Sequence, residues 1–177
     1  EAMGAEVVLL HEGGEEDWRA HAEALAEEQG LVMVTPFNDH TIVAGQGTCG
    51  REILEDLPDV DLVLVPIGGG LASGVSAALK MSRPEVKVVG VQSELSNAAQ
   101  LSLRADEIVE LPNEQTRQTI ADGMRAPRIG DITFSYMRQY IDDIITVGED
   151  EIRDAVKTLA LDARLVAEPS GAVTVAA

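Results

Sequence analysis

The residues with the clearest chemical potential are three consecutive glycines, Gly68, Gly69 and Gly70, followed by Leu71. They stand between the apolar run 62–65, typical of a buried strand, and an Ala- and Leu-rich stretch typical of a helix. At such a turn the first N–H groups of the helix have no acceptor, and the helix dipole is positive. The glycines therefore predict a phosphate-binding cradle. The alternative is a tight turn that needs a positive φ.

Other reactive side chains are few. His11, His21 and His40 are far apart and show no metal-ligand spacing with Cys49, so no metal site is predicted. Cys49 falls in a helix expected over 41–57, where a buried small apolar residue is favoured over a reactive thiol. It is the only cysteine, so the chain forms no internal disulfide and a reducing cytoplasm is expected.

The composition limits the class of protein. The 177 residues suffice for about one domain, and 45% hydrophobic residues indicate a folded globular chain. A net charge of −18 argues against nucleic acid or an anionic membrane as a partner. No apolar stretch has the length of a membrane span, and residues 1–4 begin no signal peptide pattern.

Short apolar runs alternate with stretches of helical period along the chain, which predicts strands alternating with helices. This order favours an α/β fold of three-layer αβα type, with a mostly parallel sheet and helices on both faces. The segment 112–130 is expected to be mostly irregular. The expected strands are 6–10, 31–34, 62–65, 86–91 and 144–147, and the expected helices are 15–29, 41–57, the stretch after the glycines, 95–104, the stretch after Gly148 and one opened by Pro169.

Several segments form a set with a recognisable order and spacing over nearly the whole chain: 4–9, 36–39, 42–48, 65–74, 119–123 (Thr-Ile-Ala-Asp-Gly), 147–152 and 168–172 (Glu-Pro-Ser-Gly-Ala). As a set they resemble the pyridoxal-phosphate-dependent threonine and serine dehydratases, or ammonia-lyases, and their serine racemase relatives. These families share the tryptophan-synthase-β-like structure. Each segment alone is weak evidence, but the whole set is specific.

The resemblance implies an incomplete fold type II pyridoxal-phosphate enzyme. Residues 1–34 would be a remnant of the small domain, and residues 35–177 most of the large cofactor-binding domain. The strands expected in 1–34 would then have exposed edges, so a homo-oligomer is expected. The implied cofactor is pyridoxal 5'-phosphate.

The resemblance also assigns site residues. The phosphate would lie on the N–H groups of Gly68, Gly69, Gly70 and Leu71, although the family's loop has four glycines before the leucine position and this chain has three. Gly123 and Glu168 fall at positions near the cofactor ring in the family, and Phe37 at a position bordering the substrate pocket. For Glu168 the alternative is a helix N-cap before Pro169, and for Phe37 it is an ordinary core residue.

Two parts of the family's chemistry have no counterpart in this sequence. The Schiff-base lysine and the Ser-Gly-Asn loop of the family lie upstream of the segment that matches 4–9. Lys80, Lys87 and Lys157 are predicted to be ordinary solvated lysines, and Asp142 part of a solvated turn. Gln92 and Ala98 stand where some relatives have carboxylates for a divalent cation, so that site is expected to be lost. No catalytic residue is therefore assigned, and the chain alone is expected to be inactive.

The function implied for the parent family is the β-elimination of L-threonine or L-serine to a 2-oxo acid and ammonia. Two alternatives remain open. One is another reaction of the same class, racemisation or β-replacement of an amino acid. The other is a non-catalytic truncated homologue that serves as a binding or assembly module.

Overall fold

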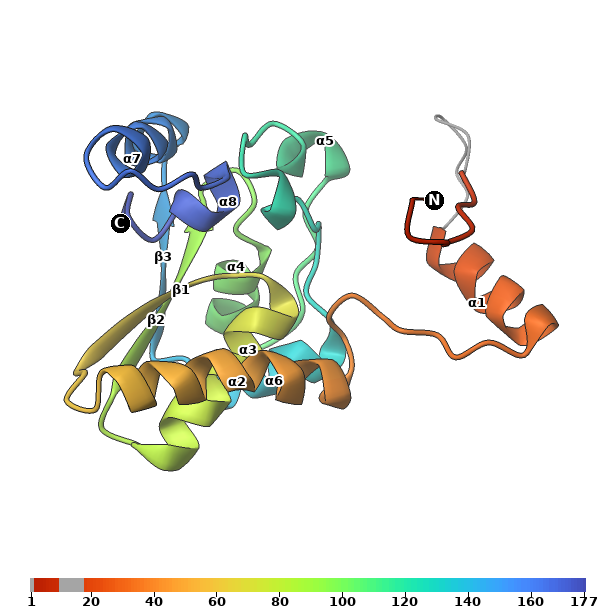
Figure 1. Ribbon diagram of the computed structural model, residues 1–177, viewed down its shortest axis with the longest axis horizontal. Helices are drawn as coiled ribbons and strands as arrows, with labels where there is room; N and C mark the ends of the chain where they lie inside the picture. Colours follow the sequence, from red (N-terminus) through yellow and green to blue (C-terminus); the bar gives the residue numbers. More distant parts are fainter. Residues whose placement is uncertain (1, 10–17) are drawn as a thin grey trace. The chain divides into compact units, whose positions relative to one another are not determined.

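The computed structural model describes residues 2–9 and 18–177, with only the backbone for Trp18 and Arg19. The chain divides into two compact units, residues 1–35 and residues 36–177. Figure 1 colours them from red and orange at the N-terminus to blue at the C-terminus. Each unit is described separately below.

The first unit contains helix α1 (Trp18–Gln29). The helix stops at Gly30, whose φ of +66° is a left-handed conformation that glycine adopts without strain. The amide of Leu31 donates to the carbonyl of Ala26 at 2.8 Å, which satisfies one of the last helical carbonyls. The predicted helix with its glycine stop is confirmed for the residues that the structure describes, whereas positions 15–17 lie outside them.

The two strands predicted in this unit are wrong for the residues described. Segments 6–9 and 31–34 form no strand and are not part of the sheet, and residue 10 lies outside the described part. A strand is stabilised by hydrogen bonds to a neighbour, and an apolar run without one has no such bonds. Val32 accordingly leaves 89% of its surface exposed.

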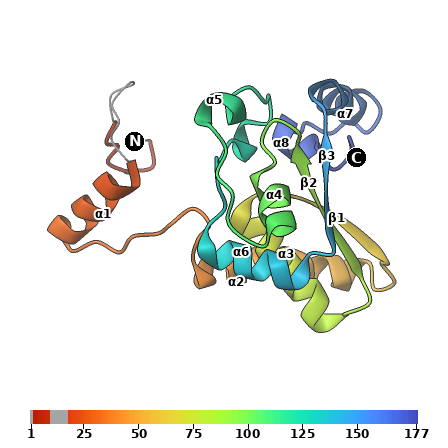
Figure 2. The same ribbon diagram turned by 180° about the vertical axis from the view of Figure 1, so that it is seen from behind.

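The second unit is built on a three-stranded parallel sheet in the order β1-β2-β3, formed by β1 (Leu62–Pro66), β2 (Lys87–Ser93) and β3 (Asp143–Val147). Figure 2 shows the three strands side by side. Leu64 pairs with Val89, and Val91 pairs with Ile145. The three strands predicted in this part of the sequence are confirmed.

Helices cover both faces of this sheet, as predicted for a three-layer fold. Val63, Val65 and Val88 point to one face, where they form a core with Leu79 and Met137 of two helices. Alternate residues point to the opposite face and pack on the C-terminal helices; these are Val91 and Val147, against Ile152 and Val173. The helices are α3 (Gly69–Ser82), α4 (Ala98–Ala105), α6 (Asp131–Tyr140), α7 (Glu149–Leu161) and α8 (Pro169–Ala172).

Helix α2 (His40–Asp56) packs on α3 rather than on the sheet, and Figure 1 shows α2, α3 and α6 next to one another. The two helices touch through glycines. A Cβ on Gly74 of α3 would overlap the carbonyl oxygen of Val43 and lie 2.5 Å from the amide nitrogen of Gly47. Cys49 faces away from this contact and is exposed, so the prediction that it is buried is wrong.

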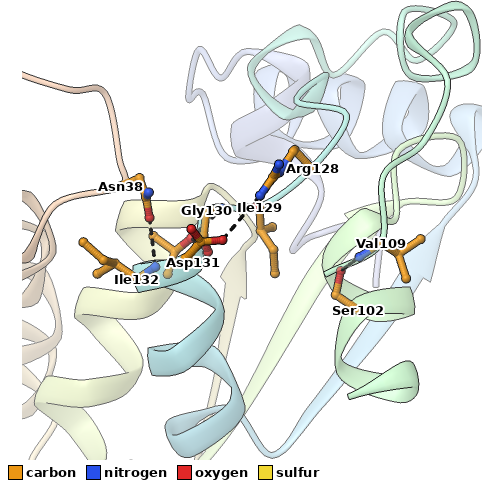
Figure 3. A network of polar contacts seen from close by, with 9 residues as sticks. Asn38, Ser102, Val109, Arg128, Ile129, Gly130, Asp131 and Ile132 are labelled. Atoms are coloured by element: carbon orange, nitrogen blue, oxygen red, sulfur yellow. Dashed lines mark hydrogen bonds and ion pairs between the residues drawn. The ribbon is translucent and has the colours of Figure 1, made fainter. Parts of the chain in front are cut away.

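Two adjacent residues cap two different helices. Asp39 accepts from the amide of Thr41 at 2.7 Å, and this hydrogen bond holds the pKa of Asp39 below its usual value. Asn38 Oδ1 accepts from the amide of Ile132 at 3.0 Å, at the start of α6 (Figure 3). The chain lies so close there that a Cβ on Gly130 would overlap the Asn38 side chain. The second cap therefore requires glycine at position 130.

Lys80 is not the solvated lysine that was predicted, whereas Asp142 is exposed as predicted but makes specific contacts. The Lys80 side chain is only 17% exposed, and its Nζ lies 2.7 Å from Asp142 Oδ2. The same carboxylate oxygen accepts from the backbone amide of Val88 at 2.7 Å. Asp142 thus ties the end of α3 and the start of β2 to the segment before β3. The sequence pattern missed it because these partners lie far apart in the chain.

The segment 112–130 is mostly irregular, as predicted. It contains only the short helix α5 (Asn113–Thr116) and the 3₁₀ helix η1 (Asp122–Met124). Helix α6, by contrast, was not predicted. In the part of the chain that the structure describes, no helix has the length and apolar character needed to cross a bilayer.

Candidate functional site

The glycine turn joins β1 to α3. The strand ends at Pro66, Gly68 precedes the helix with φ −109° and ψ 136°, and the helix begins at Gly69. None of the three glycines has a positive φ; among the glycines that the structure describes, only Gly4 and Gly30 do. The alternative interpretation of this run, a tight turn that requires left-handed glycine, is therefore wrong.

The start of α3 presents backbone donors without acceptors. Gly68 donates its N–H to the carbonyl of Pro66 at 3.0 Å, and its own carbonyl accepts from Ala72 at 3.0 Å. No side chain caps the helix. Within the described part of the chain the N–H groups of residues 69, 70 and 71 have no hydrogen-bond acceptor, so they are free to bind an anion at the positive end of the helix dipole.

Gly68 and Gly69 differ in what a side chain at their position would meet. A Cβ on Gly69 would lie 3.0 Å from Cδ2 of Phe37, so a side chain there would need that ring to shift by a few tenths of an ångström. A Cβ on Gly68 would have nothing within 4 Å, and its backbone angles suit any residue. The protein itself therefore makes no demand for glycine at position 68. What glycine does there is leave open space beside the free N–H groups.

The turn opens into a cavity of about 310 Å³. Phe37, the whole turn from Gly68 to Leu71 and Gly123 line this cavity. A second hollow of about 220 Å³ shares Gly68, Leu71 and Gly123 with the first and is also lined by Glu168. The seven residues predicted for the site lie between positions 37 and 168 of the sequence, and the fold brings them together around two adjoining hollows.

Gly123 reaches the cavity because its segment is tied to α8. Its amide donates to Ser170 Oγ at 3.0 Å. A Cβ on Gly123 would lie 3.0 Å from the same hydroxyl oxygen, so only glycine allows this approach without a shift. The Thr-Ile-Ala-Asp-Gly and Glu-Pro-Ser-Gly-Ala segments are therefore neighbours in space.

Glu149, the first residue of α7, holds the same segment from the other side. Its carboxylate accepts from the amide of Ile120 at 2.8 Å and from Ser93 Oγ at 3.0 Å. Burial by itself raises the pKa of Glu149, but hydrogen bonds from Thr119, Ile120 and Ser93 outweigh it and lower the pKa. An ionised carboxylate thus connects the end of β2 with the loop that carries Gly123.

Glu168 occupies the N-cap position of α8 by its backbone, with φ −70° and ψ 159°. Its carbonyl accepts from the amides of Gly171 and Ala172 at 3.0 and 3.1 Å. Its side chain makes no capping hydrogen bond, so side-chain capping does not explain why a glutamate stands there. The exposed carboxylate instead borders the smaller hollow, 3.9 Å from the position of a Cβ on Gly123.

Gln92 and Ala98, considered in the sequence for a lost cation site, both line the larger cavity. Gln92 Nε2 donates to the carbonyl of Ser96 at 3.1 Å, and its Oε1 accepts from the amide of Gln100 at 3.0 Å. The amide is thus committed to shaping the cavity wall. Over residues 2–9 and 18–177, no three His, Cys, Asp or Glu side chains gather as metal ligands would.

Two polar residues of the cavity were missed by sequence reasoning. Gln46 lies on α2, and Arg128 lies in the irregular segment between η1 and α6. Arg128 closely follows the Thr-Ile-Ala-Asp-Gly motif and precedes α6, whose N-cap is Gly130. Its closeness to that motif was the one sequence feature that could have indicated a place in the site. Gln46 had none, because an exposed glutamine in a helix has no distinguishing pattern.

A family model described as "Pyridoxal-phosphate dependent enzyme" matches residues 1–177. The chain belongs to this family. Its cofactor carries a phosphate, and the turn fits that group because three N–H groups without acceptors stand beside the space that a Cβ on Gly68 would fill. The predicted fold type and cofactor class are confirmed by this membership.

Individual relatives agree with the family. The chain is 46% identical over 176 residues to the L-threonine ammonia-lyase of Thermotoga maritima, covering 99% of this chain and 43% of that protein. It is 41% identical over 171 residues to the catabolic L-threonine dehydratase of Escherichia coli, covering 96% and 51%. The structure of maize serine racemase matches with a TM-score of 0.86 and 36% identity, covering 93% and 51%. The chain spans about half the length of these curated relatives.

Proposed function

We propose that this chain supplies the phosphate-binding part of an enzyme that eliminates water from L-threonine or L-serine and yields a 2-oxo acid and ammonia. The observation that carries the proposal is the turn before α3, with three free N–H groups and open space at Gly68. The names of the relatives, L-threonine ammonia-lyase and L-threonine dehydratase, support the choice of reaction.

The residues of the cavity would have distinct tasks in this enzyme. The N–H groups of Gly69, Gly70 and Leu71 would hold the cofactor phosphate, and Gly68 would leave room for it. Phe37 would form an apolar wall that keeps water from one side of the site. Gly123 and Glu168 would border the ring of the cofactor. When bound, pyridoxal phosphate withdraws electrons from the Cα of an amino acid.

The lysines of the chain lie elsewhere. Lys80 pairs with Asp142, Lys87 begins β2, and Lys157 lies 2.8 Å from Asp154 on α7. None of the three lines either hollow. The described chain thus offers no amine to bond to the cofactor, and we propose that by itself it binds the cofactor phosphate without carrying out the reaction.

We also propose a place for each unit in the enzyme. Residues 1–34 would belong to the small domain, and residues 35–177 to the large domain. Leu31, Val32 and Val34 leave 59%, 89% and 72% of their surfaces exposed, and such apolar surface is usually covered by a partner. This exposed surface supports a homo-oligomer; we further propose that the enzyme is cytoplasmic and acts on an amino acid, as the names of its relatives suggest for the substrate.

Serine racemisation is the second candidate, favoured by the match to maize serine racemase. Both reactions begin by removing the proton from Cα, so a shared cofactor cradle supports either one. The product distinguishes them, since elimination from L-serine gives pyruvate and racemisation gives D-serine.

The cradle can be tested by filling its open space. Gly68→Val keeps an allowed backbone, because φ −109° and ψ 136° suit a β-branched residue. Its side chain would occupy the space beside the free N–H groups. We expect phosphate and pyridoxal phosphate to bind at least about tenfold more weakly, measured by ³¹P NMR titration.

Gly45→Ala is the matched control, since a Cβ at Gly45 also meets nothing within 4 Å but lies on α2 away from the turn. It should bind phosphate as the parent does. Equal phosphate affinity in the parent and in Gly68→Val would show that the turn is not the cradle.

A further inference from the structure

The segment 119–125 carries Gly123, which lines both hollows. Hydrogen bonds hold this segment at several points. The amide of Gly123 donates to Ser170 Oγ at 3.0 Å, and the Arg125 guanidinium donates to the carbonyl of Thr119 at 2.7 Å. The position of Gly123 relative to the glycine turn is therefore determined by the contacts that fix this segment.

Glu149 supplies a charged anchor for the segment at Ile120, three residues before Gly123. Its Oε2 accepts from the amide of Ile120 at 2.8 Å, and its Oε1 accepts from Ser93 Oγ at 3.0 Å. Ser93 is fully buried at the end of β2. Each carboxylate oxygen thus serves a different partner, and the side chain joins the sheet to the segment. Hydrogen bonds to an ionised group are about twice as strong as those between neutral groups.

Apolar packing also holds the segment, but in a less specific way. Ala121 and Met124 belong to the same core cluster as Ile152 of α7. Apolar contacts have no direction, so they keep the segment against α7 without fixing its exact position. A hydrogen bond constrains both the distance and the angle between donor and acceptor. The exact placement of the segment therefore requires the bonds to Glu149.

The glycine turn before α3 has supports of its own. The amide of Ile67 donates to the carbonyl of Val91 at 3.0 Å, and the carbonyl of Gly68 accepts from Ala72. Helix α3 is packed against α2 and α6. Removal of the Glu149 carboxylate should therefore leave the free N–H groups of the turn in place.

Resting on the function proposed above, we propose that Glu149 is a positioning residue, which sets the distance between Gly123 and the glycine turn and thereby determines how well the ring of the cofactor is bound. Glu149 lines neither hollow, so it acts through the segment that it holds rather than by contact with the cofactor. Affinity for the ring should depend on Glu149, whereas affinity for the phosphate group should not.

The test compares two ligands of the 177-residue chain by ³¹P NMR titration. Pyridoxine 5'-phosphate has the ring and the phosphate of the cofactor, with an alcohol in place of the aldehyde. Methyl phosphate has the phosphate group without the ring. The ratio of the two affinities measures what the ring contributes. Glu149→Ala removes both hydrogen bonds and should lower this ratio about tenfold, with the affinity for methyl phosphate unchanged.

Glu149→Gln is the conservative variant. Its amide oxygen can still accept from Ile120, and its NH₂ group can donate to the Ser93 hydroxyl, but both bonds are weaker without the charge. We expect a ratio about threefold below that of the parent, between the parent and Glu149→Ala.

The matched control is Glu151→Ala. Glu151 lies in the same first turn of α7 and also accepts from a backbone amide, that of Gly148 at 2.7 Å. The variant removes the same charge and one hydrogen bond at the start of α7, but this bond does not involve the segment 119–125. It should leave the ratio of affinities unchanged.

Four results would each overturn the inference: an unchanged ratio in Glu149→Ala, an equal loss of both affinities in that variant, the same fall of the ratio in Glu151→Ala, or a parent that binds the two ligands equally well. If Glu149→Ala does not fold, an unchanged ratio in Glu149→Gln overturns it. A parent that does not bind methyl phosphate would instead refute the proposed function itself.

Discussion

Both units of this chain contain short apolar runs, but in the described residues only those of the second unit form a sheet. In residues 36–177 the runs become β1, β2 and β3, which pair with one another and are covered by helices on both faces. In the described part of residues 1–35 the runs 6–9 and 31–34 pair with nothing and leave Val32 and Val34 exposed. An apolar run is therefore only a potential strand, and a neighbouring strand decides whether it becomes one.

Among the variants considered, Gly74→Val should lower the unfolding free energy of residues 36–177 the most. The new side chain would collide with the backbone of α2 at Val43 and Gly47, which only a movement of the whole helix can relieve. We expect residues 36–177 to lose about 3 kcal/mol or more of unfolding free energy, measured by urea denaturation. Gly45→Ala, on the open side of α2, should change it by no more than about 1 kcal/mol and in the stabilising direction. A stable Gly74→Val protein would mean that α2 is not needed to cover α3.

A smaller effect is expected from Asp142→Asn, which removes the ion pair with Lys80 and weakens the acceptor for Val88. The carboxylate is 36% exposed, so solvent screening limits the cost to about 1–2 kcal/mol. Urea denaturation near neutral pH measures it. Lys157→Met, which breaks the exposed pair with Asp154, is the control and should cost less than about 0.5 kcal/mol.

The stabilisation that Asp142→Asn removes should depend on pH. Burial raises the pKa of Asp142, but hydrogen bonds from Lys80 and Val88 outweigh it, so the pKa falls below its usual value of 3.8. A lowered pKa in the folded state means that the ionised carboxylate stabilises the fold above the usual value and loses this effect as the pH falls below it. The stability difference between parent and Asp142→Asn should thus be constant above a pH of about 4 and shrink below it. A difference that is independent of pH down to acid unfolding would contradict this assignment.

The smallest effect is expected from Val32→Asp. Val32 is 89% exposed, so a charge there removes almost no buried apolar area. Unfolding of residues 36–177 should shift by less than about 0.5 kcal/mol. A loss of 2 kcal/mol or so would show that this segment is covered in solution and that the contrast between the two units is smaller than described.

The sequence predicted the elements of residues 36–177 well because each has a local signal. Helix α2 has Asp39 as its cap, and Gly148 precedes three acidic residues that favour the start of α7. Helix α6 was missed because its cap comes from Asn38, 94 residues earlier, and Gly130 looks like a loop residue. Burial of Cys49 was predicted wrongly because the helix was expected to pack on the sheet rather than on α3.

The residues of the candidate site that belong to sequence motifs could be predicted from the sequence. Gly68–Leu71, Gly123, Glu168 and Phe37 were named from the sequence, and the structure brings them around adjoining hollows. Their roles toward the cofactor remain proposals. Arg128 was not named although it closely follows the Thr-Ile-Ala-Asp-Gly motif, because closeness in sequence to a motif does not show that a side chain lines the cavity.

The cap between Asn38 and α6 has a consequence for how this sequence can change over evolution. While Asn38 occupies the space beside Gly130, no other residue fits at position 130, and while position 130 is glycine, the helix depends on Asn38 for its cap. The backbone of Gly130, with φ −82° and ψ 161°, would also suit an asparagine capping its own helix. Positions 38 and 130 are therefore expected to change together during evolution. The order of the two substitutions is constrained, because α6 has a cap before both changes and after both, but the asparagine at position 130 fits only once Asn38 has been replaced.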